Sequence, residues 1–215
     1  MPSIINRFVL LPSYINLKKE GLHYRDLLIY LTIRSFNNIE TDLCIPSYDT
    51  ISERSGMSKK FVSGSLKRLE KSSYLEIDRS DRRKVSNRYS FKKTQAFSRI
   101  PYEIFKVDDL TATQKAMLIT LRQCFDSGSL ELMYDLQTVC QLLDMTYRTV
   151  YPLYIALIKL GYIEKRIKVY KSGRKRVVVT LTEKVNWHYN LPQINLRTDK
   201  KQVTFLKVVD GFLEF

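Results

Sequence analysis

Residues Tyr48–Glu76 run YDTISERSGMSKKFVSGSLKRLEKSSYLE, and residues Leu136–Glu164, 88 positions further on, run LQTVCQLLDMTYRTVYPLYIALIKLGYIE. The two stretches align without a gap, and apolar residues coincide: Ile51 with Val139, Met57 with Met145, Val62 with Val150 and Leu69 with Leu157. Each stretch is followed at once by a dense run of basic residues. Self-similarity at a fixed offset indicates one supersecondary unit that is built twice.

Residues at the boundaries inside each copy predict two helices joined by a short turn. Ser47 can cap the first of them by accepting a backbone N–H, and Gly56 can end it in the left-handed conformation. Ser58 can cap the next helix two residues later. In the second copy the equivalent positions hold Asp144, which tolerates the left-handed conformation, and Thr146, another good N-cap. This short spacing is typical of a helix-turn-helix.

The helix after each turn is expected over Lys59–Ser72 and Tyr147–Leu160, with one apolar stripe in the core. The stripes are Val62, Leu66 and Leu69 in the first copy and Val150, Tyr154 and Leu157 in the second. Polar and basic groups at the positively polarised start of such a helix suit contacts with phosphates and base edges, although an ordinary solvated face is the alternative. The candidate DNA-binding residues are Ser58, Lys59, Lys60, Ser63, Lys67 and Arg68 in the first copy, and Tyr147, Arg148, Thr149 and Tyr151 in the second.

Gly64 and Pro152 occupy equivalent positions inside these two helices, and both are poor helix formers. Tolerance near the first turns of a helix is one explanation. The other is that the helix is bent or thinned where it meets a duplex.

A basic β-hairpin is predicted after each of these helices. Residues 79–93 carry seven basic groups and one acid, Asp81, whereas residues 165–176 carry seven basic groups and no acid. Ser172-Gly173 supplies a tight turn, and Val177–Leu181 is a strong return strand. Arginine at a hairpin tip can enter a minor groove, and basic residues along its sides can neutralise phosphates. The candidates are Arg82, Arg83, Lys84 and Arg88 in the first hairpin, and Lys171, Arg174, Lys175 and Arg176 in the second.

The repeat extends upstream of the helix-turn-helix stretches. Apolar segments Phe8–Ile15 and Phe97–Ile104 resemble each other at an offset of 89, and amphipathic helices are expected over Tyr24–Phe36 and Thr113–Phe125. We therefore divide the chain into a first domain (1–94), a second domain (95–190) and a tail (191–215). The tail ends in the apolar sequence VTFLKVVDGFLEF, which either completes the second domain's core or serves as a dimerisation or partner-docking element.

The composition favours a polyanionic partner. The 215 residues include 36 Lys and Arg against 22 Asp and Glu, a net charge of +14, and their 44% hydrophobic content is enough to build cores. Three cysteines without CxxC spacing fit buried thiols in a reducing compartment, and two isolated histidines predict neither a metal site nor a cofactor. With no secretory signal and no apolar run of about 18 residues, we expect no membrane association and a cytoplasmic location, either at the nucleoid or, for a phage protein, in the host.

These residues resemble a known family. Helix, helix-turn-helix and two-stranded wing together resemble a winged-helix domain, and IPSYDTISERSGMSKKFVSGSLKRLEKSSYLEI resembles the helix-turn-helix domains of phage replisome organisers, plasmid initiators and bacterial regulators. The resemblance covers about residues 8–91 and 97–182. It implies a mainly α fold with small β-hairpins (α+β), arranged as two tandem winged-helix domains. In plasmid initiators of this kind one unit often serves dimerisation while the other makes the main DNA contacts.

We expect a sequence-specific binder of double-stranded DNA that acts as a transcriptional regulator. The alternative is a plasmid or phage replication initiator or replisome organiser that binds origin repeats, with RNA binding as a weaker third reading. The expected partners are double-stranded DNA, a second copy of the chain in a homodimer, and replisome or transcription machinery through the tail. No phosphate-binding glycine loop, paired carboxylates or histidine with a nucleophile partner is evident, so we predict that the chain is not an enzyme.

Overall fold

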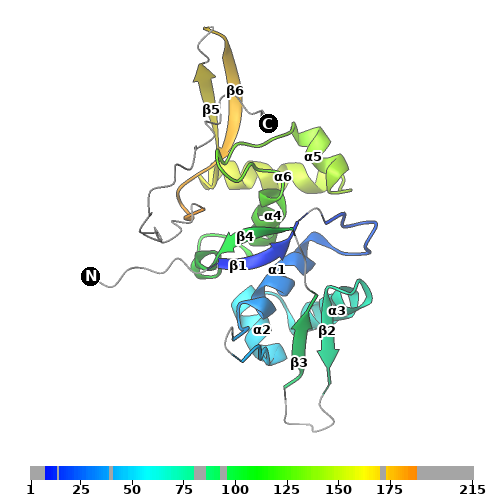
Figure 1. The fold of residues 1–215 in the computed structure, drawn as a ribbon. Helices are drawn as coiled ribbons and strands as arrows, with labels where there is room; N and C mark the ends of the chain where they lie inside the picture. Colours follow the sequence, from blue (N-terminus) through cyan, green and yellow to red (C-terminus); the bar gives the residue numbers. More distant parts are fainter. Residues whose placement is uncertain are drawn as a thin grey trace, which may run out of the picture.

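In the computed structural model of the chain, residues 8–13, 15–38, 41–79, 86–92, 96–169 and 173–187 are described. The fold is mixed α and β, with small antiparallel hairpins (Figure 1). The first unit contains, in order, β1 (Phe8–Pro12), α1 (Tyr24–Arg34), α2 (Tyr48–Ser55), α3 (Lys59–Lys71), β2 (Leu75–Asp78) and β3 (Arg88–Phe91). The second unit contains β4 (Phe97–Pro101), the 3₁₀ helix η1 (Tyr102–Lys106), α4 (Ala112–Arg122), α5 (Leu136–Leu142), α6 (Tyr147–Lys159), β5 (Ile163–Val169) and β6 (Lys175–Leu181).

The turn between α2 and α3 is built as the sequence predicts. The Ser47 hydroxyl accepts a hydrogen bond from the backbone N–H of Thr50 at 3.1 Å and so caps α2. Gly56 ends α2 at a φ of 69°, in the left-handed region, and Ser58 accepts from the N–H of Phe61 at 3.3 Å. The caps therefore fix where α2 ends and where α3 begins.

The equivalent turn of the second unit differs at one cap. Asp144 takes a positive φ of 50°, as expected of the residue that replaces glycine there. Thr146 is the N-cap residue of α6, but its side chain makes no capping bond, so the expectation of a good side-chain cap is wrong. Its hydroxyl lies 2.9 Å from the hydroxyl of Thr149 instead, and the two pair with each other.

Each third helix buries the stripe that its sequence predicts. Val62, Leu66 and Leu69 of α3 and Val150, Tyr154 and Leu157 of α6 are all at most 5% exposed. Full burial of an aliphatic side chain contributes about 1.5–3 kcal/mol. Because each stripe faces the core, the opposite face of α3 and of α6 is directed toward solvent.

A two-stranded antiparallel sheet joins the two units, and the sequence did not predict it. β1 and β4 pair in a register that runs from Phe8 opposite Pro101 to Pro12 opposite Phe97. The central pair is Leu10 and Arg99, which are separated by 89 residues, the same offset that relates the two upstream segments. The segments thus pair with each other as two copies of one strand would across a two-fold axis.

Other contacts between the units follow the same arrangement. α1 packs against α4, with the hydroxyl of Thr120 3.5 Å from the carbonyl of Tyr24. Lys18 reaches Asp144 of the second unit at 3.5 Å. One continuous cluster of buried residues runs through both units. The two units on either side of the proposed border between residues 94 and 95 therefore share a core. Figure 1 shows that the hairpins β2–β3 and β5–β6 extend from opposite ends of the molecule.

None of the helices in the described ranges is long and apolar enough to cross a membrane. The tail, residues 191–215, lies outside the described residues.

Candidate nucleic-acid interface

The outer face of α3 presents most of the residues predicted in the first unit. Lys60 and Lys67 are exposed and Ser63 is half-buried. Ser58 is exposed, and its hydroxyl already serves as the N-cap of α3. Lys59 pairs with Asp49 of α2 at 2.6 Å, but both side chains are mostly exposed, so the pair is worth little and can exchange for a phosphate.

Arg68 is the predicted residue whose side chain is already engaged. Its Nε donates to Oδ2 of Asp26 at 2.7 Å and its Nη2 to Oδ1 at 2.6 Å, and Asp26 is fully buried. These hydrogen bonds raise the pKa of Arg68 above its usual value. A bidentate pair with a buried carboxylate is expensive to break. The structure therefore gives Arg68 a role in positioning α3, and we leave it out of the DNA-binding proposal below.

The first hairpin, β2–β3, begins directly after α3. Arg88 is exposed and lies opposite Asp78 in the strand register. Arg79 forms a bidentate pair with Glu70 of α3, with the shorter contact at 2.5 Å, and this lowers the pKa of Glu70. The predicted residues Arg82, Arg83 and Lys84 lie outside the described residues. The Arg79–Glu70 pair thus joins the base of this hairpin to α3.

The outer face of α6 has a different chemistry from that of α3. Tyr147, Arg148, Thr149 and Tyr151 are all exposed. The rings of Tyr147 and Tyr151 are stacked, with centroids 4.9 Å apart and planes 18° from parallel. Helix α6 contains no acidic residue, and within the described part of the chain Arg148 forms no ion pair. The sequence identified these four residues, but it did not show that the two tyrosines stack.

The second hairpin is the longer one, with seven residues in each strand. Arg174, Lys175 and Arg176 are exposed near its tip, whereas Lys171 lies outside the described residues. Lys168 is held by Glu131 at 2.8 Å, and Arg166 pairs with Glu164 of its own strand. Arg174 and Arg176 therefore stand outside these ion pairs, whereas Lys168, which lies opposite Arg176 in the strand register, is engaged.

One face of this hairpin is apolar, which sequence reasoning missed. Ile167 and Val177 lie opposite each other in the register and are 68% and 61% exposed, and Val169 is 60% exposed. Alternation along β5 and β6 would have shown it, because these residues share a face with buried Ile163 and Leu181.

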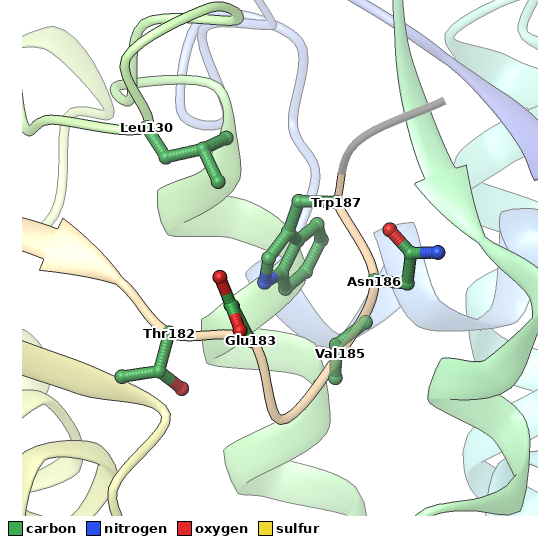
Figure 2. Close-up of a pocket in the computed structure, with 6 residues that line it drawn as sticks. All are labelled: Leu130, Thr182, Glu183, Val185, Asn186 and Trp187. Carbon is green, nitrogen blue, oxygen red and sulfur yellow. The ribbon is translucent and has the colours of Figure 1, made fainter. Parts of the chain in front are cut away.

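Among the described residues no group of three or more His, Cys, Asp or Glu side chains could hold a metal ion. A cavity of about 340 Å³ follows β6 and is lined by Leu130, Thr182, Glu183, Val185, Asn186 and Trp187 (Figure 2). Its lining contains one carboxyl group, that of Glu183, and the buried Trp187 ring. The cavity offers an apolar surface without a second titratable group for acid–base chemistry.

The comparisons with known proteins agree with the geometry of the first unit. A family model described as a helix-turn-helix domain matches residues 20–75, which contain α1, α2, α3 and the first residue of β2. No curated protein matches the chain. The chain therefore contains a helix-turn-helix domain in its first unit, and such a domain suggests DNA as a partner.

Proposed function

We propose that the protein binds double-stranded DNA sequence-specifically through two winged-helix units, each with a recognition helix and a basic wing. α3 and α6 are the recognition helices, and the hairpins β2–β3 and β5–β6 are the wings. The observation that carries the proposal is the helix-turn-helix of residues 20–75, whose helix α3 has an outward face of lysine and serine. The same order of elements in the second unit supports a second winged helix.

Charge supports duplex DNA as the ligand. The net charge is +14, and Lys60, Lys67, Arg148 and the tip arginines stand outside the ion pairs that the described residues form. Each phosphate that such a group neutralises releases counterions, which makes the affinity depend steeply on salt. Residues at the start of a recognition helix read base edges, whereas wing residues contact the backbone.

The pairing of β1 with β4 supports a specific form of DNA site. Two units related by a two-fold axis present their recognition helices in opposite orientations, as the two subunits of a dimeric repressor do. Here both units belong to one chain, and their outer faces differ: Lys60 and Ser63 in α3 correspond to Arg148 and Tyr151 in α6. We therefore expect one chain to recognise an inverted pair of unlike half-sites.

Transcriptional regulation is the process that we propose for this binding, with replication initiation at origin repeats as the alternative. The fused pair of units is the observation that favours the alternative. We further propose that the protein is not an enzyme, because its sequence has no phosphate-binding glycine loop and no paired carboxylates.

The decisive experiment is selection of bound sequences from a random pool of duplexes by the full-length protein. Recovery of a motif with two unlike, inverted halves is the expected result. Recovery of no motif, with binding to all duplexes alike, would contradict sequence-specific recognition. The genomic position of the recovered motif, ahead of genes or repeated at an origin, then separates regulation from replication.

Variants assign the halves to the units. Lys60→Ala is expected to relax selection in one half only, and Arg148→Ala in the other, at about 1–3 kcal/mol for each lost base contact. Lys159→Ala, at the exposed C-terminal end of α6, is the matched control because this end points away from the start of the recognition helix. Equal loss on every sequence for Lys60→Ala would place that lysine on phosphates.

A further inference from the structure

The stacked tyrosines of α6 carry an inference that rests on the proposed DNA binding and deepens it. Tyr147 and Tyr151 are 49% and 43% exposed, so each ring leaves much of its surface open while the two rings contact each other. In α3 the equivalent positions are Lys59 and Ser63. The second unit therefore replaces a charged, hydrogen-bonding surface with an aromatic one at the start of its third helix.

The charges around the pair fit a nucleic acid. Between Leu136 and Ile163 the chain has one acidic residue, Asp144, and Lys18 of the first unit pairs with it. Arg148 is the neighbour of Tyr147 and extends from the same exposed end of α6. An aromatic surface beside an arginine that forms no ion pair with a described residue suits a ligand that is both aromatic and anionic, and nucleotides combine the two properties.

The state of the bases decides which nucleic acid fits. In a duplex the faces of each base are covered by its neighbours, and only base edges are open in the grooves. Tyrosine rings contribute most by stacking on a base face, which is worth about 1–3 kcal/mol per base and tolerates any sequence. An exposed pair of rings therefore matches bases that have left the stack.

Pro152 adds a polar group beside the rings. Proline has no N–H, so the carbonyl of Arg148, four residues earlier, lacks its helical donor. Pro152 is itself exposed.

We propose that Tyr147 and Tyr151 form a stacking platform for unpaired DNA bases, so that the second unit holds a locally opened strand while the first unit holds the adjoining duplex. Arg148, at the same end of α6, contacts the half-site of the second unit.

The test compares three probes with the full-length protein: the selected duplex, the same duplex with a short mismatched run in the half-site of the second unit, and oligo-dT. Tyr147→Ala/Tyr151→Ala removes the rings, and Tyr147→Phe/Tyr151→Phe keeps the rings without the hydroxyls. We expect the mismatched duplex to bind more tightly than the intact one, and the alanine pair to lose about 5- to 100-fold in affinity for it. The phenylalanine pair is expected to keep the affinity. Thermal unfolding verifies that both variants fold.

A 2-aminopurine in the mismatched run reports stacking directly. Quenching by the wild type and the phenylalanine pair, but not by the alanine pair, is the expected result. The platform would be overturned if the alanine pair bound all three probes as tightly as the wild type does. It would also be overturned if the alanine pair kept its affinity for the mismatched duplex while the phenylalanine pair lost it. A protein that prefers the intact duplex, and loses affinity for it in both double variants, would use the hydroxyls for groove contacts instead. Failure of the wild type to bind any of the three probes would overturn the proposed function itself.

Discussion

Arg68 of α3 binds Asp26 of α1 through two parallel hydrogen bonds of 2.7 and 2.6 Å, and the carboxylate that it holds is fully buried. Asp26 also accepts from the backbone N–H of His23 at 2.8 Å, which completes the capping box of α1. One carboxylate therefore both caps α1 and fixes α3 against it. The orientation of the recognition helix depends on this pair as much as on the apolar stripe beneath it.

Replacing Arg68 by methionine is expected to destabilise the first unit. The change leaves the Asp26 charge buried without its cationic partner, which costs about 3–5 kcal/mol for a fully buried pair. Because the Arg68 side chain is 36% exposed, we expect a smaller loss of about 2 kcal/mol in the free energy of unfolding. Urea denaturation measures it.

The neighbouring Lys67→Met is the matched control for Arg68→Met. Lys67 is exposed and forms no ion pair with a described residue, so its replacement is expected to leave stability unchanged and to weaken DNA binding. The opposite pattern, with Arg68→Met stable but defective in binding, would return Arg68 to the DNA-contacting face.

The sequence predicted the elements that depend on neighbouring residues and missed those that depend on distant ones. Ser47 and Gly56 lie within a few residues of the backbone groups that they serve, so their roles could be inferred. The pair of Asp26 and Arg68 spans 42 residues, so no local pattern in the sequence predicts it. The β1–β4 sheet required a register between two segments that look alike, and the offset of 89 was a clue to it.

Gly64 and Pro152 give a prediction about helix stability and DNA contact. A Cβ at Gly64 would lie 3.4 Å from Nη1 of Arg68, which is an ordinary van der Waals contact, so Gly64→Ala is expected to stabilise α3 by up to about 1 kcal/mol. Pro152→Ala restores a helical N–H and is expected to stabilise α6 by about 1–3 kcal/mol. Thermal unfolding measures both changes. If Gly64 and Pro152 bend or thin the helices where they meet a duplex, the more stable variants will bind DNA more weakly. Unchanged affinity would show that the two residues have no role in DNA contact.

The tip of the second wing is expected to contact the DNA backbone. Arg174→Ala/Arg176→Ala should weaken binding to all sequences and reduce the slope of log affinity against log salt by about 0.9 for each lost phosphate contact. Titrations at several salt concentrations measure the slope. Lys159→Ala should keep the wild-type slope. A double variant with that same wild-type slope would show that the wing lies away from the backbone.

The three buried cysteines predict protection from alkylation. Burial raises the pKa of Cys44 to about 12 and that of Cys124 to about 11. At pH 8 far fewer Cys44 thiols are then ionised in the folded state than in the unfolded chain. We expect pulsed iodoacetamide to label Cys44 only as denaturant unfolds the protein. Labelling of the native protein at the rate of the unfolded chain would contradict the packing around Cys44.

The raised pKa values of these thiols also predict how the stability of the fold changes with pH. A group whose folded pKa is raised binds its proton more tightly in the folded state. Its contribution is fully present below the unfolded pKa of about 8.5, and it is lost as the pH rises toward 12. Stability should therefore fall with rising pH above this value, and Cys44→Ala should make the fall shallower.

The two-fold register of β1 and β4 predicts how the first unit behaves alone. A fragment of residues 1–94 loses the partner strand of β1 and the helix that covers α1, and buried residues such as Val9 and Leu11 become exposed. Because Leu10 lies opposite Arg99, its own repeat equivalent, β1 can pair with a second β1 in the same register, with Leu10 opposite Leu10. We expect the fragment to form a homodimer, which light scattering coupled to size-exclusion chromatography measures. Leu11→Asp should reduce dimer formation, whereas Lys71→Asp, at the exposed end of α3, should not. A folded monomer of the unmodified fragment would show that the two units do not depend on each other.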